Sequence, residues 1–212
     1  MRRQVIIIAL GAATALTVAA CSGSGATPGT STPAPPTTPA ASSGQELPYA
    51  GAPKVSMPLP ESIFSGDPCA DTLNADQILK AVGKPSETKR VDADTVGPGC
   101  QWLNKSTTGQ VTMRYATKLP GGLSAIYENV KPKAEIWKPI SSLQGFPAVA
   151  YVSPSGGSPT EFCQISIGAT DSTTIEVSVF LSLNSEGKKD PCESANTVAD
   201  LVMTSLRAKA GV

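Results

Sequence analysis

The spacing of apolar residues changes along the chain and divides it into three parts. Residues 5–18 contain no charged side chain, and residues 22–43 consist of Ser, Thr, Gly, Ala and Pro. Regular apolar periods appear only beyond about residue 60. Because a period of two residues marks a half-buried strand and a period near 3.6 marks an amphipathic helix, we expect residues 61–212 to form the globular domain.

Six segments predict strands. The clearest is 173–183, in which Ile175 and Val177 face one side and Glu176 and Ser178 face the other. Phe180 lies on the polar side of that strand, where it either meets a flanking helix or lines a groove. The predicted strands are 101–103, 110–116, 134–138, 148–152, 162–167 and 173–183.

Capping signals and helical periodicity predict three helices. Asn74 is suited to cap the first, Gln77 follows three residues later as in a capping box, and Gly83 ends the helix. The third helix begins at Pro191. The apolar faces are Ile78, Leu79 and Val82 in the first helix, Leu123, Ile126, Tyr127 and Val130 in the second, and Val198, Leu201, Val202 and Leu206 in the third.

The order of these elements indicates the fold class. A helix is followed by strands, a second helix, more strands and a final helix. Short turns between successive strands favour antiparallel pairing, and amphipathic helices bury their apolar stripe against a sheet. The sequence therefore predicts an α+β domain in which helices flank a central antiparallel sheet.

The charge balance excludes several classes of protein. The chain has 17 basic residues, 17 acidic residues and no histidine. Without residues 1–20, which hold two arginines and no acid, 15 basic residues stand against 17 acidic ones. A near-neutral chain lacks the basic stripe of a nucleic-acid-binding protein, so we expect no nucleic acid partner. The absence of histidine excludes Ser-His-Asp triads and Cys-His dyads.

The N-terminus has the three-part layout of a bacterial lipoprotein signal peptide. Two arginines precede the uncharged run, and two alanines stand directly before Cys21. The run is shorter than the roughly 20 residues of a membrane-spanning helix. We expect residues 1–20 to be removed and Cys21 to carry a diacylglycerol anchor with palmitate on the outer face of the cell membrane. Residues 21–60 are then expected to form a disordered tether, because their composition cannot bury a core.

Four further cysteines, Cys69, Cys100, Cys163 and Cys192, form an even set. In an oxidising compartment such a set is typical of two disulfides, and four cysteines allow three pairings. Cys69 and Cys192 each follow Asp-Pro at the start of a predicted helix, whereas Cys100 and Cys163 each open a predicted strand. Pairing the two cysteines at helix starts with each other, and the two at strand starts with each other, favours Cys69–Cys192 and Cys100–Cys163. Because the chain has no Cys-x-x-Cys pair and no histidine, we expect no metal site.

Two short motifs match serine–lysine hydrolases by spacing alone. They are Ser86-x-x-Lys89 and Ser185-x-x-Lys188, and the active form of the motif places the serine at the start of a helix. Ser86 is predicted to lie in a loop and Ser185 at the end of a strand. We therefore expect neither motif to be catalytic.

Two acids and two tryptophans are further candidates. Asp92 and Asp94 could bind calcium as a pair, but the other oxygen ligands of a calcium loop are missing, so a solvated loop is expected. Trp102 stands beside Cys100 and is expected in the core, packed on a disulfide. Trp137 is expected at a strand edge and partly exposed.

The cysteine-containing segments follow an ordered pattern. Asp-Pro-Cys stands at 67–69 and at 190–192, Gly-Cys-Gln-Trp at 99–102 and Phe-Cys at 162–163. With Cys21 and the Pro/Thr-rich tether, the chain resembles a family of actinobacterial, largely mycobacterial, envelope lipoproteins of unknown function. The resemblance implies a two-disulfide sandwich related to the PsbP/Mog1-type fold. It implies no reaction, because a fold does not define a function.

These observations favour a non-catalytic binding or accessory module without a cofactor. Its partner would be an envelope protein, a lipid or a glycan, and the ligand-binding residues remain open at this point. The alternative is an envelope hydrolase that uses Asp, Glu, Ser or Lys without histidine. An apolar ligand in a pocket between the sheet and a helix would favour the binding module.

Overall fold

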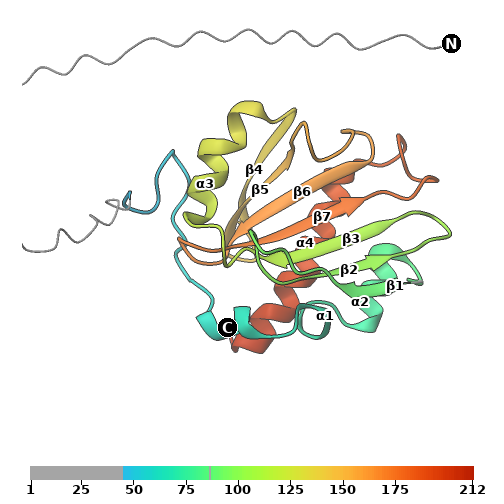
Figure 1. Cartoon of the computed structure of the whole chain (residues 1–212), viewed down its shortest axis with the longest axis horizontal. Helices are drawn as coiled ribbons and strands as arrows, with labels where there is room; N and C mark the ends of the chain where they lie inside the picture. The colour runs from blue at the N-terminus through green and yellow to red at the C-terminus, as the bar shows by residue number, and fades with distance from the viewer. Residues whose placement is uncertain (1–44, 86) are drawn as a thin grey trace, which may run out of the picture. The chain divides into compact units, whose positions relative to one another are not determined.

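A seven-stranded antiparallel sheet organises the residues that this computed structural model describes, which are 45–85 and 87–212 (Figure 1). The strands are β1 (Glu87–Arg90), β2 (Gly99–Leu103), β3 (Gln110–Tyr115), β4 (Ile136–Leu143), β5 (Phe146–Val152), β6 (Phe162–Gly168) and β7 (Thr174–Phe180). Their order across the sheet is β1-β2-β3-β7-β6-β5-β4, so β1 and β4 form the two edges.

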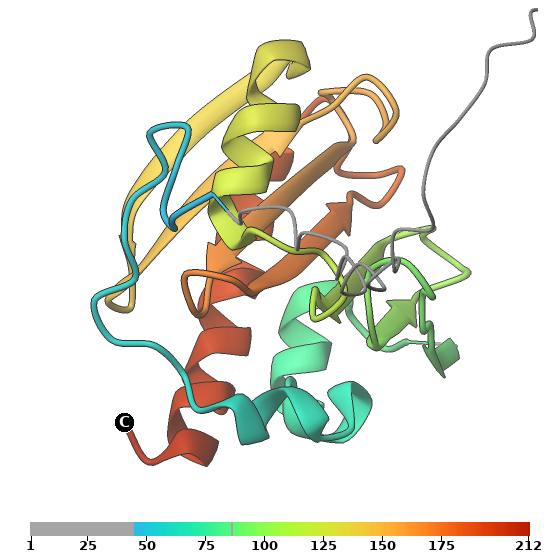
Figure 2. The ribbon, with the colours of Figure 1, turned by 60° about the vertical axis from the view of Figure 1, so that its left-hand side comes forward.

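Helices cover both faces of this sheet (Figures 1 and 2). The helical elements are η1 (Glu61–Ser65), α1 (Pro68–Asp71), α2 (Ala75–Val82), α3 (Gly122–Asn129), η2 (Lys131–Lys133) and α4 (Pro191–Ala210). The 20-residue helix α4 lies on one face together with α1 and α2, and α3 packs against the other face over β5 and β6. The predicted antiparallel sheet with helices is confirmed, and the sheet is its larger part.

The face under α4 carries the main core. Val177 in β7 and Ile165 in β6 are paired in register and are fully buried. Val202 and Leu206 of α4 belong to the same cluster, and so does Trp102, which is buried as predicted. Each fully buried side chain of this size contributes about 1.5–3 kcal/mol. The burial of these alternating strand residues is therefore the main source of the stability of the domain.

The opposite face holds a buried carboxylate. Glu176, which the alternation places on the polar side of its strand, is only 7% exposed. Its Oε2 accepts hydrogen bonds from Gln164 Nε2 (2.7 Å) and Ser166 Oγ (2.6 Å), and its Oε1 accepts one from Thr174 Oγ1 (2.5 Å). Burial raises the pKa of Glu176 above its ordinary value, and the three hydrogen bonds oppose that shift.

The predicted tether is too long at its C-terminal end. Val55 and Leu59 are 6% and 2% exposed and belong to the main core cluster. The Val55 N–H donates to Asp171 Oδ1 at 2.8 Å, and the Leu59 N–H donates to the Ala169 carbonyl at 2.9 Å. The prediction of a disordered segment is therefore wrong for residues 45–60. This stretch packs without regular secondary structure, so it lacks the periodicity that marks the rest of the domain in the sequence.

Both edge strands differ from the prediction. β1 was missed because its sequence, Glu-Thr-Lys-Arg, has no apolar alternation. β4 continues past the predicted end at Lys138, through Pro139, to Leu143. A proline cannot donate to a neighbouring strand, but β4 pairs only with β5, so an edge position accommodates it.

The predicted disulfide pairing is wrong. The bonds are Cys69–Cys100 and Cys163–Cys192, each with a Cα–Cα distance of 5.0 Å. Cys100 in β2 and Cys163 in β6 are separated by β3 and β7, which places them about 14 Å apart at the usual strand spacing. A disulfide requires Cα atoms within about 7 Å. Each bond therefore joins the start of a helix to the strand beneath it, rather than joining like with like.

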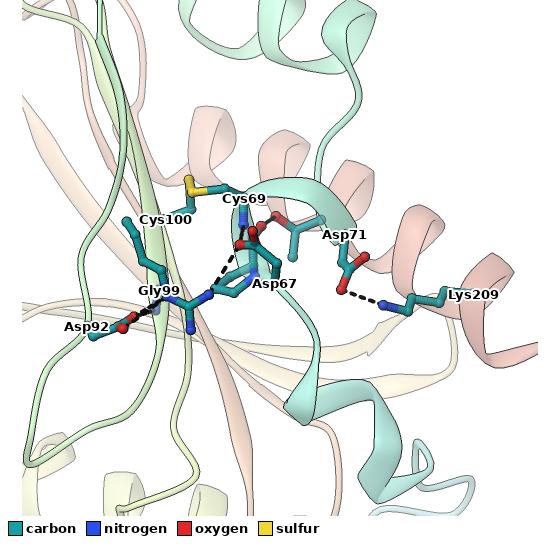
Figure 3. A network of polar contacts seen from close by, with 10 residues as sticks. Asp67, Cys69, Asp71, Asp92, Gly99, Cys100 and Lys209 are labelled. Carbon is teal, nitrogen blue, oxygen red and sulfur yellow. Dashed lines mark hydrogen bonds and ion pairs between the residues drawn. A yellow bond between two sulfur atoms is a disulfide. The ribbon is translucent and has the colours of Figure 1, made fainter.

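Polar contacts fix the start of α1 around the first of these bonds (Figure 3). The Cys69 N–H donates to Asp67 Oδ1 at 2.9 Å, which caps the helix. Arg90 of β1 lies 3.3 Å from the same carboxylate and 2.9 Å from Asp92. At the other end of α1, Asp71 pairs with Lys209 of α4. The short helix is thus held to the sheet and to α4.

The two disulfides suggest an extracytoplasmic location, because such bonds persist in oxidising compartments. Among the described residues, no helix has the length and apolar character needed to cross a membrane.

Candidate functional site

A cavity of about 460 Å³ lies between α2, the N-terminal half of α4 and one end of the sheet. Figure 2 shows α2 running beside α4. The end of β7, the segment that connects β7 to α4, and the turn between β2 and β3 complete the lining. The volume falls within the range of about 300–1,000 Å³ that is typical of small-molecule sites.

The α2 wall is positioned by the capping box that the sequence predicted. Asn74 Oδ1 accepts from the Gln77 N–H at 2.9 Å, and Gln77 Oε1 accepts from the Asn74 N–H at 2.8 Å. The Gln77 side chain also donates to the Leu201 carbonyl at 3.2 Å and accepts from Ser205 Oγ at 3.0 Å. The first turn of α2 is therefore fastened to α4, and the cavity lies beyond it, where Lys80 and Leu201 line opposite walls.

The turn between β2 and β3 is fastened to the end of α2 by Asn104. This side chain is 8% exposed, and its Nδ2 donates to the Val82 carbonyl at 3.2 Å. Its Oδ1 accepts from the backbone and the hydroxyl of Ser106 at 3.2 and 2.6 Å. Both polar atoms of this side chain bond within the protein, so Asn104 maintains the shape of the cavity.

The α4 wall is anchored at its N-terminus. The Cys192 N–H donates to the capping carboxylate of Asp190 at 2.7 Å, and Cys192 is bonded to Cys163 in β6. Lys138 Nζ lies 2.9 Å from the Asp190 carboxylate and holds the pKa of that group below its ordinary value. One disulfide thus fixes the helix that forms this wall, and the other fixes the segment that leads into α2.

The cavity has an apolar floor and a polar rim. Val179 and Val198 are 3% exposed, and Phe180 and Leu201 are half-buried beside them. Hydroxyl groups of five residues, Thr107, Ser182, Ser185, Ser194 and Thr197, line the same space. Its charged lining residues are Lys80 and Lys189. An apolar surface with a few polar groups is the usual composition of a ligand site.

Ser185 is the residue from the two hydrolase motifs that lines this cavity. It lies in a turn rather than at the start of a helix, and its hydroxyl accepts a hydrogen bond from Ser182 Oγ at 3.0 Å. Lys188 lines a neighbouring hollow with Asp190 and Glu193. This arrangement differs from the helical one in which serine and lysine share a face. Ser86, from the other motif, lies outside the described residues.

Asp92 and Asp94 lie away from the cavity. Asp92 accepts hydrogen bonds from Arg90 Nε at 2.9 Å and from the Gly99 N–H at 3.2 Å (Figure 3). The hydrogen bond from Arg90 lowers the pKa of Asp92. Asp92 therefore joins β1 to the start of β2, and Asp94 lies exposed in the connecting turn. Within residues 45–85 and 87–212, no group of three or more His, Cys, Asp or Glu side chains could hold a metal ion.

The aromatic candidates divide between the two faces of the sheet. Trp137 is half-buried on the α3 side, where its ring lies 6.1 Å from that of Tyr151 and 5.0 Å from that of Tyr127. Phe180 lines the cavity and contacts Phe162 with ring centroids 4.7 Å apart. Of the two alternatives for Phe180, the groove is the one that the structure supports.

Sequence reasoning did not identify the lining residues Lys80, Asn104 and Lys189. The sequence did contain one sign of the α4 wall. Ser194, Thr197 and Leu201 recur at helical spacing and form a mixed polar and apolar face on α4. The opposing wall comes from residues more than 80 positions away, and only the packed structure brings the two together. Cys21 and the predicted segment 1–20 lie outside the described residues.

Comparison with known protein families gives one match. The family described as "Protein of unknown function (DUF3558)" matches residues 16–205. No curated protein matches the chain.

Proposed function

We propose that this chain, which belongs to the DUF3558 family, is a non-catalytic binding module of the cell envelope that holds a ligand with an apolar part. The observation that carries this proposal is the cavity between α2, α4 and the sheet, with its apolar floor of Val179, Phe180, Val198 and Leu201. This is the kind of pocket, between sheet and helix, that the sequence analysis associated with the binding module.

The construction of the walls supports a permanent cavity rather than a gap in packing. Each wall is held by a disulfide close to it and by buried side-chain hydrogen bonds, such as those of Gln77 and Asn104. Apolar surface that stays in contact with water costs about 25 cal/mol per Å², so a ligand that covers the floor gains binding energy. A preformed site also avoids the free-energy cost of ordering its walls.

We further propose that the protein is anchored on the outer face of the cell membrane by a lipid on Cys21. The signal-like segment before Cys21 and the extracytoplasmic location suggested by the disulfides support this proposal. A sheet covered by helices on both faces is also compatible with kinship to the PsbP/Mog1-type sandwich, which we retain as part of the proposal. The anchor would place the cavity near membrane lipids and envelope proteins.

Binding of the neutral fluorophore N-phenyl-1-naphthylamine tests the cavity. The purified, oxidised protein should raise its fluorescence saturably, because the apolar floor shields the probe from water. Thr197 is exposed at the cavity, so Thr197→Trp should block the space and weaken binding. Glu128→Trp adds the same side chain on α3, over the other sheet face, and should leave binding unchanged. An unsaturable signal, or equal binding by both variants, would contradict the proposal.

A further inference from the structure

We infer that the ligand of this cavity is an anionic amphiphile whose phosphate or carboxylate headgroup lies between Lys80 and Lys189. This inference rests on the proposed function of the same cavity and adds the chemical class of the ligand. Three properties of the lining carry it: the sign of its charges, the hydroxyl groups beside them and the apolar floor below.

The charges that line the cavity have one sign. Lys80 lies in the last turn of α2, and Lys189 lies in the segment that leads into α4, so the two cations belong to opposite walls. The lining contains no aspartate or glutamate. Among the described residues, neither amine lies within 4.0 Å of a carboxylate, whereas Lys138 and Lys209 are paired with Asp190 and Asp71.

Two unpaired cations across one opening select for an anion. The mature chain carries a small net negative charge, so a cavity whose charged residues are all lysines differs in sign from the chain as a whole. Like charges repel, and an anion placed between them removes that repulsion while it pairs with both. A neutral or cationic headgroup would gain neither contribution.

Hydroxyl groups complete the headgroup site. The Ser185 oxygen accepts the hydrogen bond from Ser182, which leaves the Ser185 proton available to a ligand. The Ser194 and Thr197 hydroxyls donate to the backbone carbonyls of Asp190 and Glu193, so toward the cavity they present oxygen acceptors. Phosphate and carboxylate oxygens only accept hydrogen bonds when ionised, so the Ser185 hydroxyl and the two lysine ammonium groups are donors that suit them.

The floor requires that the anion carry an apolar tail. Val179, Val198 and Leu201 lie beneath the rim, and a free inorganic anion would leave them in contact with water. Phe180 and Leu181 also line a second hollow of about 320 Å³, whose lining includes Glu161 and Glu186. The large apolar side chain of Leu183, which lines that second hollow, is 66% exposed. The two hollows thus share the apolar side chains of Phe180 and Leu181, and the glutamates of the second disfavour an anionic headgroup there.

A pair of amphiphiles with the same tail tests the headgroup. Dodecyl phosphate and dodecyl maltoside are titrated below their micelle concentrations, both by displacement of N-phenyl-1-naphthylamine and directly by calorimetry. Each exposed lysine contributes modestly, so together the two should make dodecyl phosphate bind about tenfold more tightly than dodecyl maltoside. Lys80→Gln/Lys189→Gln should reduce that ratio to about one.

Controls separate this inference from the proposed function. Lys54→Gln/Lys133→Gln removes the same charge at exposed positions outside the cavity and should keep the preference. Equal binding of the two amphiphiles by the unmodified protein, or a preference that survives in the Lys80/Lys189 variant, would overturn the inference. Displacement of the fluorophore by inorganic phosphate at the same concentration as dodecyl phosphate would overturn it too. Failure of the fluorophore alone to bind refutes the proposed function, while calorimetry still reports the headgroup preference.

Discussion

Removal of the first disulfide offers a quantitative test of how the cavity walls are held. Cys69 and Cys100 are 31 residues apart, and Cys163 and Cys192 are 29 apart. In the chain-entropy model, loops of this length give each bond about 3.5–4 kcal/mol of stability, and the two loops differ by less than about 0.1 kcal/mol. Cys69→Ala/Cys100→Ala should therefore lower the free energy of unfolding in urea by about 4 kcal/mol.

The second bond should cost more to remove because of its burial. Cys163 and Cys192 are 0% and 3% exposed, whereas in the first bond only Cys100 is fully buried and Cys69 is half-buried. Deleting the two buried sulfur atoms adds a loss of packing of about 1 kcal/mol to the loss of the cross-link. A loss below about 1 kcal/mol for either double variant would refute the view that these bonds hold the walls.

Thiol counting checks the pairing in the same samples. Cys69→Ala/Cys100→Ala should leave Cys163 and Cys192 fully oxidised, because they bond to each other. Cys69→Ala/Cys192→Ala should release two free thiols. If the second variant shows no free thiol, Cys100 is bonded to Cys163, and the pairing Cys69–Cys100 and Cys163–Cys192 is refuted.

Three further predictions concern other parts of the domain. Burial raises the pKa of Glu176, so its contribution to stability is complete below its ordinary value of 4.5 and is lost as the pH rises through the higher folded value; in thermal unfolding, the melting temperature of the unmodified protein should fall relative to that of Glu176→Gln as the pH rises above 4.5. Asn104→Ala leaves the Val82 carbonyl without the side-chain donor that it has now. The substitution should lower the free energy of unfolding in urea by about 1–3 kcal/mol and weaken binding of the fluorophore. Leu59→Ala should lower the free energy of unfolding in the same assay by about 2–5 kcal/mol. A negligible loss would mean that residues 45–60 belong to the tether and not to the folded domain.

The strands and helices with strong periodicity were predictable from sequence. Val177 and Ile165 occupy core positions because alternation in a strand places every second residue on one face. The capping box of α2 was equally readable, since Asn74 and Gln77 interact within one turn. On that helix, however, Leu79 is 57% exposed although it was assigned to the apolar face, and Gln77 is buried because it bonds to α4.

The features that escaped prediction depend on which segments become neighbours. The like-with-like disulfides required Cys100 and Cys163 to lie side by side, but β7 returns to pair with β3 and separates them. The cavity likewise requires that Lys80 and Lys189, which are distant in the sequence, line the same space. Local pattern describes each wall, whereas strand order decides which walls face each other.

The order of the cysteines has a consequence for how the protein is made. Each bond joins two cysteines that follow one another along the chain, Cys69 with Cys100 and Cys163 with Cys192. A chain that leaves a membrane pore N-terminus first exposes the first pair completely before either member of the second appears. If the cysteines are oxidised in the order in which they emerge, the native bonds form directly and an oxidant is sufficient. A nested pairing would first form non-native bonds between cysteines that emerge early, and an isomerase would be needed to correct them.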